Sequence, residues 1–538
     1  MSYMIHKKYL PLIIFGMLAI GVFLGARLNT SFIQSKTFFT SRSTQFNKLS
    51  EIISYISNEY VDTIDQKTLV DNSIEKILQQ LDPHSAYIPA EDLQAVNETL
   101  EGNFEGIGIE FYILDDTIMV VSAISGGPSE AVGILPCDRI VKVNDENVAG
   151  VGITNRDVLQ KLRGKGGTEV NVLIARRGLK KLLPFKIIRG KIPIYSVDVA
   201  YMLNDSVGLI KISRFAATTY DEFKKALNGL QAEGMKHLIL DLRGNPGGYL
   251  DAAIRMADEF LPDKKLIVYT EGKSRPRTSY SATRKGDFET GSLAVLIDEG
   301  SASASEIVAG AVQDWDRAVI IGRRSFGKGL VQEQTVFPDG SALRLTIARY
   351  YTPTGRSIQK PYSGGYEDYQ REIQNRLSHG ELESADSIHF SDTLKYTTPG
   401  GKTVYGGGGI MPDYFIPLDT SVYSDYLQQV VANAVISQFA YDYVDKNRKA
   451  LDSYKTVKQF IRFFSVNDQL MKEFVRYAET KGVNRDEKGL KISGSFISLQ
   501  LKASIGRLLF RNEGFYPVLF ENDPAVLKAV QIFQEVSN

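Results

Sequence analysis

Amphipathic helices are predicted in the N-terminal part of the chain. Apolar side chains recur there at three- and four-residue spacing, as at Leu49, Ile52 and Ile56, which is the period of a helix with one buried face. A second helical stretch ends before Pro83, because proline cannot continue a helix. Residues 28–101 are therefore predicted to be a polar tether followed by a helical region.

Short apolar strands separated by glycine turns follow. Strands are predicted at residues 118–123, 138–144 and 169–175, and one helix ends near Leu162. Short apolar runs bounded by turn residues are typical of strands. Residues 102–190 are therefore predicted to form a β-rich module.

Apolar runs alternate with amphipathic segments between residues 191 and 417. The predicted strands are residues 207–212, 237–241, 293–297 and 318–321, and the predicted helices are residues 220–232, 250–260 and 305–315. Strands alternating with helices indicate a parallel or mixed sheet, with functional sites at the carboxyl ends of its strands. Residues 360–400 are polar and irregular, and they are predicted to form an exposed excursion or lid.

The last part of the chain, residues 418–538, is helical in pattern and carries no obvious chemistry. Helices are expected at residues 426–444, 457–464, 469–481 and 499–510. At 538 residues the chain is too long for one hydrophobic core. The fold class is therefore predicted to be multidomain α+β, with an α/β core and a helical C-terminal region.

The N-terminus holds an uncharged, mostly apolar run from Tyr9 to Ala26, preceded by two lysines. A helix of this length spans about 27 Å, close to the thickness of a bilayer core. Residues 1–27 are therefore predicted to be a membrane anchor, with a cleaved signal peptide as the alternative. Either segment indicates export of the large polar domain that follows.

Composition narrows the classes of function. The chain has 63 basic and 63 acidic residues, so its net charge gives no attraction to nucleic acid. Cys137 is the single cysteine of the sequence, which excludes an internal disulfide framework and a cysteine-based metal cluster.

Ser303 and Lys328 carry the most specific candidate chemistry. Ser303 lies where an apolar strand leads into a helix, and Lys328 lies in a glycine-rich turn further along. A buried lysine has a lowered pKa, and its neutral form can take the proton of a serine hydroxyl. Gln332 is placed to hydrogen-bond the amine. None of the five histidines lies in either motif, so a Ser-Lys pair is favoured over a Ser-His-Asp triad.

An oxyanion hole is predicted beside Ser303. A glycine-bearing turn follows each of three core strands, and we expect these turns to meet at one edge of the sheet. The N–H group of Ala304, together with that of Gly247 or Gly248, would then face the developing negative charge of a tetrahedral intermediate.

Chemistry alone does not choose among Ser301, Ser303 and Ser305, because one of them is expected to cap the helix. Glu306 is interpreted as a capping carboxylate rather than an acid catalyst. The residues interpreted as structural are His84, Asp241 and Arg243.

A phosphate-binding loop is an alternative interpretation. The segment from Gly322 to Lys328 matches the pattern Gly-x4-Gly-Lys, but Gly329 stands where a hydroxyl must bind Mg²⁺. The residues after Gly329 alternate like a strand, whereas a phosphate loop opens a helix. Nucleotide hydrolysis is therefore disfavoured.

The β-rich module opens with Gly106-Ile107-Gly108-Ile109. Glycines let successive backbone N–H groups turn inward and hold a chain-terminal carboxylate. This loop and the order of the strands and helices after it resemble a PDZ domain. The resemblance implies that residues 102–190 bind the C-terminus of a peptide along a strand edge.

The chain also resembles the C-terminal processing peptidases, or tail-specific proteases, over roughly residues 46–417. The motifs that carry this resemblance are Leu81-Asp-Pro-His-Ser85, Leu240-Asp-Leu-Arg-Gly-Asn-Pro-Gly-Gly248, Gly300-Ser-Ala-Ser-Ala-Ser-Glu306, Phe326-Gly-Lys-Gly329, Tyr351-Thr-Pro-Thr-Gly355 and Gly409-Ile-Met-Pro-Asp413. The resemblance implies a Ser-Lys protease core over residues 191–417, an inserted PDZ domain, and no metal or cofactor. It assigns Ser303 as the nucleophile, Lys328 as the base and Gln332 as the partner of the base.

The predicted function is therefore a serine endopeptidase that binds protein C-termini through its PDZ domain and cleaves exported or envelope proteins. A catalytically latent PDZ scaffold protein is the alternative. The expected partners are unfolded or C-terminally exposed proteins and the membrane, but not nucleic acid, and a homo-oligomer is compatible with the sequence. The expected location is the cell envelope, with an inner-membrane anchor and the catalytic domain on the periplasmic or extracytoplasmic side.

Overall fold

The computed structural model describes residues 44–283, 285–390 and 392–537. The chain divides into two compact units, with the boundary after Leu78. The apolar run predicted to be an anchor lies outside the described residues. Within the described ranges, no helix combines the length and the apolar character needed to cross a membrane.

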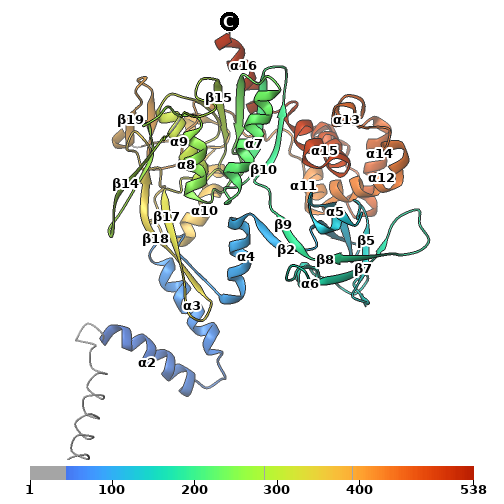
Figure 1. The fold of residues 1–538 in the computed structure, drawn as a ribbon, viewed down its shortest axis with the longest axis horizontal. Coiled ribbons are helices and arrows are strands. Elements are labelled where there is room, and N and C mark those ends of the chain that lie inside the picture. Colours follow the sequence, from blue (N-terminus) through green and yellow to red (C-terminus); the bar gives the residue numbers. More distant parts are fainter. Residues whose placement is uncertain (1–43, 284, 391, 538) are drawn as a thin grey trace, which may run out of the picture. The chain divides into compact units, whose positions relative to one another are not determined.

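The described part of the first unit is helical, as the spacing of its apolar residues predicts. It contains α2 (Thr44–Glu59) and most of α3 (Gln66–Gln79) (Figure 1). Most side chains of α2 from Lys48 onward are exposed.

The second unit begins with β1 (Ala86–Ile88) and α4 (Ala90–Glu101) and continues into the β-rich module. The strands of the module are β3 (Ile109–Leu114), β4 (Thr117–Ala123), β5 (Arg139–Val143), β6 (Glu146–Asn147), β7 (Glu169–Ala175) and β8 (Leu183–Ile188). They pair antiparallel in the order β3-β4-β5-β7-β8, with β6 on β5, so β3 is an edge strand. Two short helices complete the module, α5 (Pro128–Ala131) and α6 (Asn155–Leu162).

The two ends of the module are connected to the rest of the unit by a pair of hydrogen-bonded strands. β2 (Asn103–Gly106) and β9 (Gly190–Pro193) pair antiparallel, with Gly106 opposite Gly190. The chain therefore enters and leaves the module through two paired strands.

A six-stranded sheet forms the α/β core (Figure 1). Its strands, in spatial order, are β10 (Val197–Met202), β11 (Val207–Ile212), β12 (His237–Asp241), β15 (Ser292–Ile297), β16 (Val319–Gly322) and β21 (Tyr414–Phe415). β10 is antiparallel to β11, and the other neighbours are parallel. The observed bounds of β11 and β12 are those predicted from their apolar runs.

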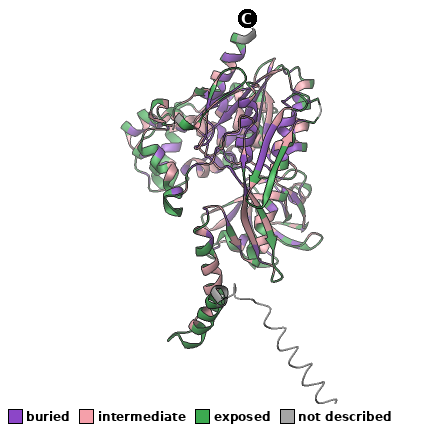
Figure 2. Ribbon diagram, turned by 90° about the vertical axis from the view of Figure 1, so that its left-hand side faces the viewer, coloured by how far each residue is buried: buried purple, intermediate pink, exposed green. Residues whose placement is uncertain are grey.

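Helices cover both faces of this sheet. One face packs against α7 (Thr219–Ala232), α8 (Leu250–Asp258) and α9 (Ala304–Asp314). The other face packs against α16 (Pro524–Ser537), whose Ala529 and Phe533 are buried. Figure 2 shows the buried residues concentrated in the sheet and its covering helices. This double coverage explains why the core strands are apolar at nearly every position.

A second, antiparallel sheet supports the core. It contains β1, β13 (Leu266–Gly272), β14 (Arg275–Ser281), β17 (Leu330–Val336) and β18 (Ala342–Tyr351). The sequence pattern predicts only β17 among these strands. A small hairpin of β19 (Lys395–Thr397) and β20 (Thr403–Tyr405) follows later in the chain.

The C-terminal region is helical, as predicted. Its helices are α11 (Asp425–Ala432), α12 (Val435–Leu451), α13 (Val457–Phe463), α14 (Asp468–Thr480) and α15 (Glu487–Phe520). The single helix expected over residues 426–444 is broken at Ala434, whose φ of 50° is left-handed. These helices share a hydrophobic cluster with Met119, Val121 and Cys137 of the β-rich module.

The segment predicted to be an exposed excursion contains α10 (Tyr366–Ser378). Tyr369 and Arg376 of this helix are buried, at 4% and 2% exposure. The other side chains of α10 are exposed or half-buried, as the prediction of an exposed segment implies, but the segment is a regular helix rather than irregular chain. Polar residues that pair with the core can be buried without an apolar stripe.

Candidate active site

The loops that leave β12, β15 and β16 carry the glycine turns, and these strands are parallel neighbours. The turns therefore meet at one edge of the core sheet, as predicted. Asn245, which is fully buried, ties the first two loops together. Its main-chain oxygen accepts the N–H of Ala302 at 2.9 Å, and its side-chain Nδ2 donates to Ile212 O at 2.9 Å.

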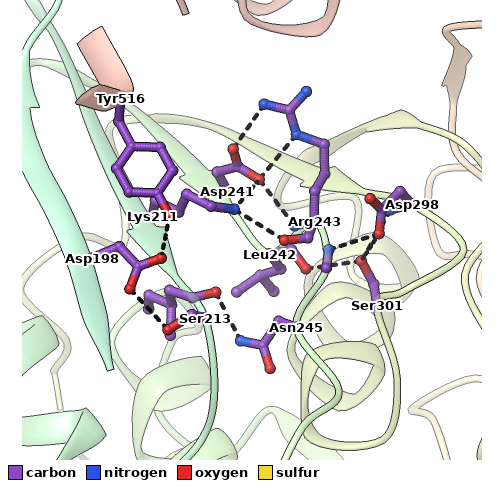
Figure 3. Close-up of polar contacts among 12 residues, drawn as sticks. Asp198, Lys211, Ser213, Asp241, Leu242, Arg243, Asn245, Asp298, Ser301 and Tyr516 are labelled. Atoms are coloured by element: carbon purple, nitrogen blue, oxygen red, sulfur yellow. Dashed lines mark hydrogen bonds and ion pairs between the residues drawn. The ribbon is translucent and has the colours of Figure 1, made fainter. Parts of the chain in front are cut away.

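Figure 3 shows the ion pair at the base of the first loop. Arg243 contacts both oxygens of Asp241, with Nη2 2.8 Å from Oδ2 and Nε 3.0 Å from Oδ1. Burial favours a higher pKa for Asp241, but the charges of Arg243 and Lys211 bring the pKa below its ordinary value. The pair shapes the loop, which agrees with its interpretation as structural.

The three serines of the second loop have different surroundings. Ser301 and Ser305 are fully buried, and their hydroxyls donate to the carbonyl oxygens of Leu242 and Asn245, each at 2.9 Å. Ser303 is half-buried and lines a cavity of about 910 Å³. Its hydroxyl donates no hydrogen bond to any residue that the structure describes. Ser303 therefore differs from the other two serines, whose hydroxyls are bound to carbonyl oxygens of the first loop.

The backbone of Ser303 is strained, with φ 56° and ψ −112°. Such a conformation costs a non-glycine residue about 1–3 kcal/mol and is found mainly at functional sites. Gly247 permits it, because a Cβ at that position would lie 2.8 Å from the Cβ of Ser303. The hydroxyl of Tyr350 donates to Ser303 O at 3.0 Å and holds the turn in place.

The predicted oxyanion donors are not equivalent. Ala304 and Gly248 line the cavity, and their N–H groups have no acceptor among the described residues. The N–H of Gly247, in contrast, donates to Asn245 Oδ1 at 2.9 Å. Gly247 therefore allows a close approach to Ser303, whereas Gly248 and Ala304 have N–H groups available for a ligand.

Lys328 and Gln332 are joined by a hydrogen bond of 3.1 Å from Nζ to Oε1. The other end of the amide, Nε2 of Gln332, donates to the carbonyl oxygen of His84. This contact turns Oε1 of Gln332 toward the amine. His84 therefore takes part through its backbone, while its ring Nε2 lies 2.7 Å from the hydroxyl of Tyr369.

The pKa of Lys328 is lowered, first by burial and then by the positive charge of Arg344. A lowered pKa raises the fraction of neutral amine, which is the form that a base needs. Ser303 and Lys328 line the same cavity. No hydrogen bond joins their side chains in the described structure, and the amine is instead held by Gln332.

Glu306 connects the serine loop to the lysine loop. It is fully buried, and its carboxylate accepts the N–H groups of Ser303, Gly327 and Lys328 at 2.7–2.9 Å and the hydroxyl of Ser325. Burial raises its pKa to about 6 against the effect of these donors. The capping contact to Ser303 agrees with the prediction, but the contacts to the lysine loop were not expected.

The residues that sequence reasoning missed act through long-range contacts. The hydroxyl of Tyr350 lies within hydrogen-bond distance of the main-chain oxygens of both Ser303 and Lys328, and Asn245 joins two loops. The motif that begins at Tyr351 lies next to Tyr350 and was a signal that could have identified it. Asn245 lies inside the first glycine motif but was not singled out.

The lysine loop does not have the architecture of a phosphate-binding loop. The chain after Gly329 forms β17, which is paired antiparallel with β18. A phosphate loop must open a helix, whose N-terminus binds the phosphate.

The glycine loop of the β-rich module lies at the start of the edge strand β3. Gly108 has a φ of 74°, and the carbonyl oxygen of Ile107 accepts from the N–H and the hydroxyl of Ser129. The N–H groups of Ile107 and Gly108 have no acceptor among the described residues. Gly106 abuts the end of α6, where its Cβ would lie 3.4 Å from the Cα of Arg163.

Three families match parts of the chain. Residues 206–369 match the model of peptidase family S41, and residues 23–92 match that of the activating protease CtpB N-terminal domain. Residues 426–511 match DUF8443, a family of unknown function.

The chain is 38% identical over 346 residues to a carboxy-terminal-processing protease of Bartonella bacilliformis, covering 63% of this chain and 78% of that protein. It is 36% identical over 333 residues to the carboxy-terminal processing protease CtpA of Bacillus subtilis, covering 62% and 70%. A solved photosystem II D1 C-terminal processing protease is similar at 25% identity and a TM-score of 0.37, covering 70% of this chain and 88% of that one. Because the two bacterial relatives match over more than two thirds of their length, the chain belongs to the carboxy-terminal processing proteases of peptidase family S41.

Proposed function

We propose that the protein is a serine endopeptidase in which Ser303 is the nucleophile and Lys328 is the general base. The observation that carries the proposal is the placement of Ser303. Of the three serines of its motif it is the one that lines the cavity, and its backbone is strained. A lysine of lowered pKa lines the same cavity. The hydrogen bond from Lys328 supports Gln332 as the residue that positions the base.

The proposed reaction has two halves. Neutral Lys328 takes the proton of the Ser303 hydroxyl as Oγ attacks the carbonyl carbon, and the N–H groups of Ala304 and Gly248 bind the oxyanion. The protonated lysine then gives its proton to the leaving amine, and an ester with Ser303 remains. Water attacks this ester, Lys328 takes a proton from the water and returns one to Oγ, and the acid product leaves. The contact between base and nucleophile forms with substrate in place, as catalytic hydrogen bonds commonly do.

Two substitutions test this proposal. Ser303→Ala and Lys328→Ala should each lower kcat/KM for an unfolded protein substrate by at least about a thousandfold. Circular dichroism and thermal denaturation should remain close to those of the wild type. Full turnover by either folded variant would exclude the proposed pair.

A catalytically latent scaffold is the second candidate function, and a fluorophosphonate probe separates the two. Labelling of the wild type but not of Ser303→Ala would show an activated serine. An unlabelled wild type without proteolysis would favour the scaffold.

We also propose that the β-rich module is a PDZ domain that captures protein C-termini. The available N–H groups of Ile107 and Gly108 support this proposal, since a chain-terminal carboxylate needs such donors. The edge strand β3 can accept the peptide as an added strand. A peptide with a free C-terminus should bind Ser303→Ala more tightly than its amide does, and equal binding would exclude capture of the carboxylate.

The proposed location is the cell envelope, with residues 1–27 as an inner-membrane anchor and the catalytic domain outside the cytoplasm. The apolar run from Tyr9 to Ala26 supports it. Fractionation of cells that express the full chain, or a chain without residues 1–27, tests the proposal. Equal recovery of both in the soluble fraction would exclude an anchor.

A further inference from the structure

The cavity that holds Ser303 is lined by cations without matching anions. Arg214 and Arg344 contribute to its wall beside the proposed base, and none of the described lining residues is an aspartate or a glutamate. The chain as a whole, in contrast, contains equal numbers of acidic and basic residues. A cleft lined by one sign of charge focuses its field and attracts the opposite charge.

Arg344 is held in place but lacks an anionic partner. Its Nη2 donates to Oε1 of Gln334 at 2.9 Å, and Nε2 of Gln334 donates to Oδ1 of Asn97 at 3.1 Å. The amide oxygen is thus turned toward the arginine. No carboxylate in the described structure pairs with Arg344, and a guanidinium has five N–H donors. Most of its donors therefore remain for a ligand.

Arg344 lies on β18, which pairs with the strand whose Gln332 binds the proposed base. β17 and β18 are antiparallel neighbours, with Gln334 opposite Arg344. Gln332, which binds Lys328, lies two residues before Gln334 and so on the same face of β17. After burial, the charge of Arg344 is the main influence that lowers the pKa of Lys328. A group bound to Arg344 thus lies near the proposed base, in the cavity that Ser303 also lines.

Arg214 brings a second cation from the core sheet. It lies in the loop after β11, next to Phe215, whose backbone pairs with that of Gly248. Its Nε is buried and has no hydrogen-bond acceptor. A buried donor without a partner is unfavourable, and a bound anion removes that cost.

We propose that Arg344 and Arg214 form an anion subsite that binds a carboxylate of the substrate beside the scissile bond. The proposal rests on the proposed function and names the substrate class of that site. The carboxylate is either an acidic side chain or the α-carboxylate of the last residue. Arginine suits this task because its planar donors match the geometry of a carboxylate.

Internally quenched peptides with the full-length protein test the subsite. In one arm, glutamine is replaced by glutamate one position at a time in a peptide with an amidated C-terminus. In the other arm, peptides that end at different distances from the cleaved bond carry a free carboxylate or an amide. The measured quantity is the ratio of kcat/KM for the charged and the neutral member of each pair. Both peptides of a pair are measured with the same enzyme variant. An effect of the Arg344 substitution on the pKa of Lys328 therefore changes both rates alike and cancels in the ratio.

In the wild type, at least one charged peptide should be cleaved about tenfold better than its neutral partner. Arg344→Gln should bring this ratio close to one, and Arg344→Lys should restore part of it. Arg349→Gln is the matched control, because Arg349 is exposed on the same strand and should leave the ratio unchanged. The arm that responds identifies the source of the carboxylate.

The subsite would be overturned if cleavage depends on Ser303 but Arg344→Gln leaves the ratio of kcat/KM unchanged in both arms. The proposed function would remain intact in that case. If the wild type cleaves no peptide, fluorescence anisotropy with Ser303→Ala replaces the rates. If the glutamate peptide binds more tightly than the glutamine peptide, and Arg344→Gln removes this difference, the subsite is supported even though the protein has not been shown to cleave peptides. Equal binding of both peptides overturns the subsite.

Discussion

At the scale of single residues, the proposed catalytic pair depends on Glu306, which holds the backbones of both loops. The donors around its carboxylate require the ionised form, and burial raises its pKa to about 6. Acidification below that pH removes an acceptor from the N–H groups of Ser303 and Lys328. The rate of hydrolysis should therefore fall on the acid side for two reasons, since acidification also shifts Lys328 toward its protonated form.

His84 gives a prediction about stability and pH. Burial, assisted by the charge of Lys328, lowers the pKa of His84 from 6.5 to about 4. Between these values the unfolded chain binds the proton and the folded chain does not, so stability falls as the pH is lowered from 6.5 to 4. The loss should reach about 2–3 kcal/mol.

Urea denaturation at several pH values measures this effect. His84→Phe lacks the titrating ring, so its stability should change less than that of the wild type across the same interval. Glu306, whose pKa is raised, increases stability as the pH is lowered, and it does so in both proteins. The difference between the stability changes of the wild type and His84→Phe therefore isolates the contribution of His84. Parallel curves for the two proteins would contradict the assignment.

The residues of the candidate site can be found in the sequence where the chemistry is local to a motif. Ser303, Lys328 and Gln332 fall within short segments, and the structure places them around one cavity or within hydrogen-bond reach. The choice among three serines could not be made from chemistry, because it depends on which hydroxyls find acceptors in another loop. The same limit applies to Gly247 and Gly248, since Asn245 decides which N–H is available.

At the scale of elements, α10 acts as a support for the lysine loop. The guanidinium of Arg376 donates to the main-chain oxygens of Arg324, Ser325 and Phe326 at 2.8–3.2 Å and pairs with Glu372. These three carbonyls lead directly into the turn that carries Lys328. The helix therefore fixes the direction from which the amine enters the cavity.

Arg376→Ala should lower both stability and turnover. Three carbonyl oxygens and Glu372 lose their partner, which should cost about 2–4 kcal/mol. The value of kcat should fall about tenfold or more, measured well below the melting temperature so that unfolding does not contribute. Arg371→Ala on the same helix is the control, because its side chain is 66% exposed and pairs only at the surface. Unchanged kcat in folded Arg376→Ala would show that α10 does not position the lysine.

The elements of the core were predictable because buried parallel strands are continuous apolar runs bounded by glycine turns. The second sheet was not, because strands such as β14 are largely exposed and lack an apolar signal. The break at Ala434 was also missed, since alanine is a strong helix former and only tertiary packing gives it a left-handed conformation.

At the scale of the whole second unit, the C-terminal helices hold the β-rich module. Asp445 of α12 is fully buried and pairs with Arg139 and Arg177 of the module, at 3.1 and 3.7 Å, and with Arg448 of its own helix. Arg507 and Arg511 of α15 pair with two further glutamates of the module. The module is thus held on one face as well as through its two-stranded ladder.

Asp445→Ala should loosen this interface without changing the catalytic loops. Removal of one partner from a buried ion pair costs about 3–5 kcal/mol. Hydrogen exchange should therefore become faster over β4 and β5 than in the wild type. Asp452→Ala, at an exposed position near the end of α12, is the control. Equal protection in both variants would mean that the ion pairs do not hold the module.

Cys137 gives this interface a natural chemical probe. The single thiol of the chain is fully buried in the cluster that the helices share with the module, and its Sγ lies 3.7 Å from Tyr441 O. Burial raises the pKa of the thiol to about 12, so it is unreactive while the interface is closed. The rate at which a thiol reagent modifies the wild-type protein therefore reports how often the interface between the helices and the module opens. A ligand that changes this rate must alter the stability of that interface.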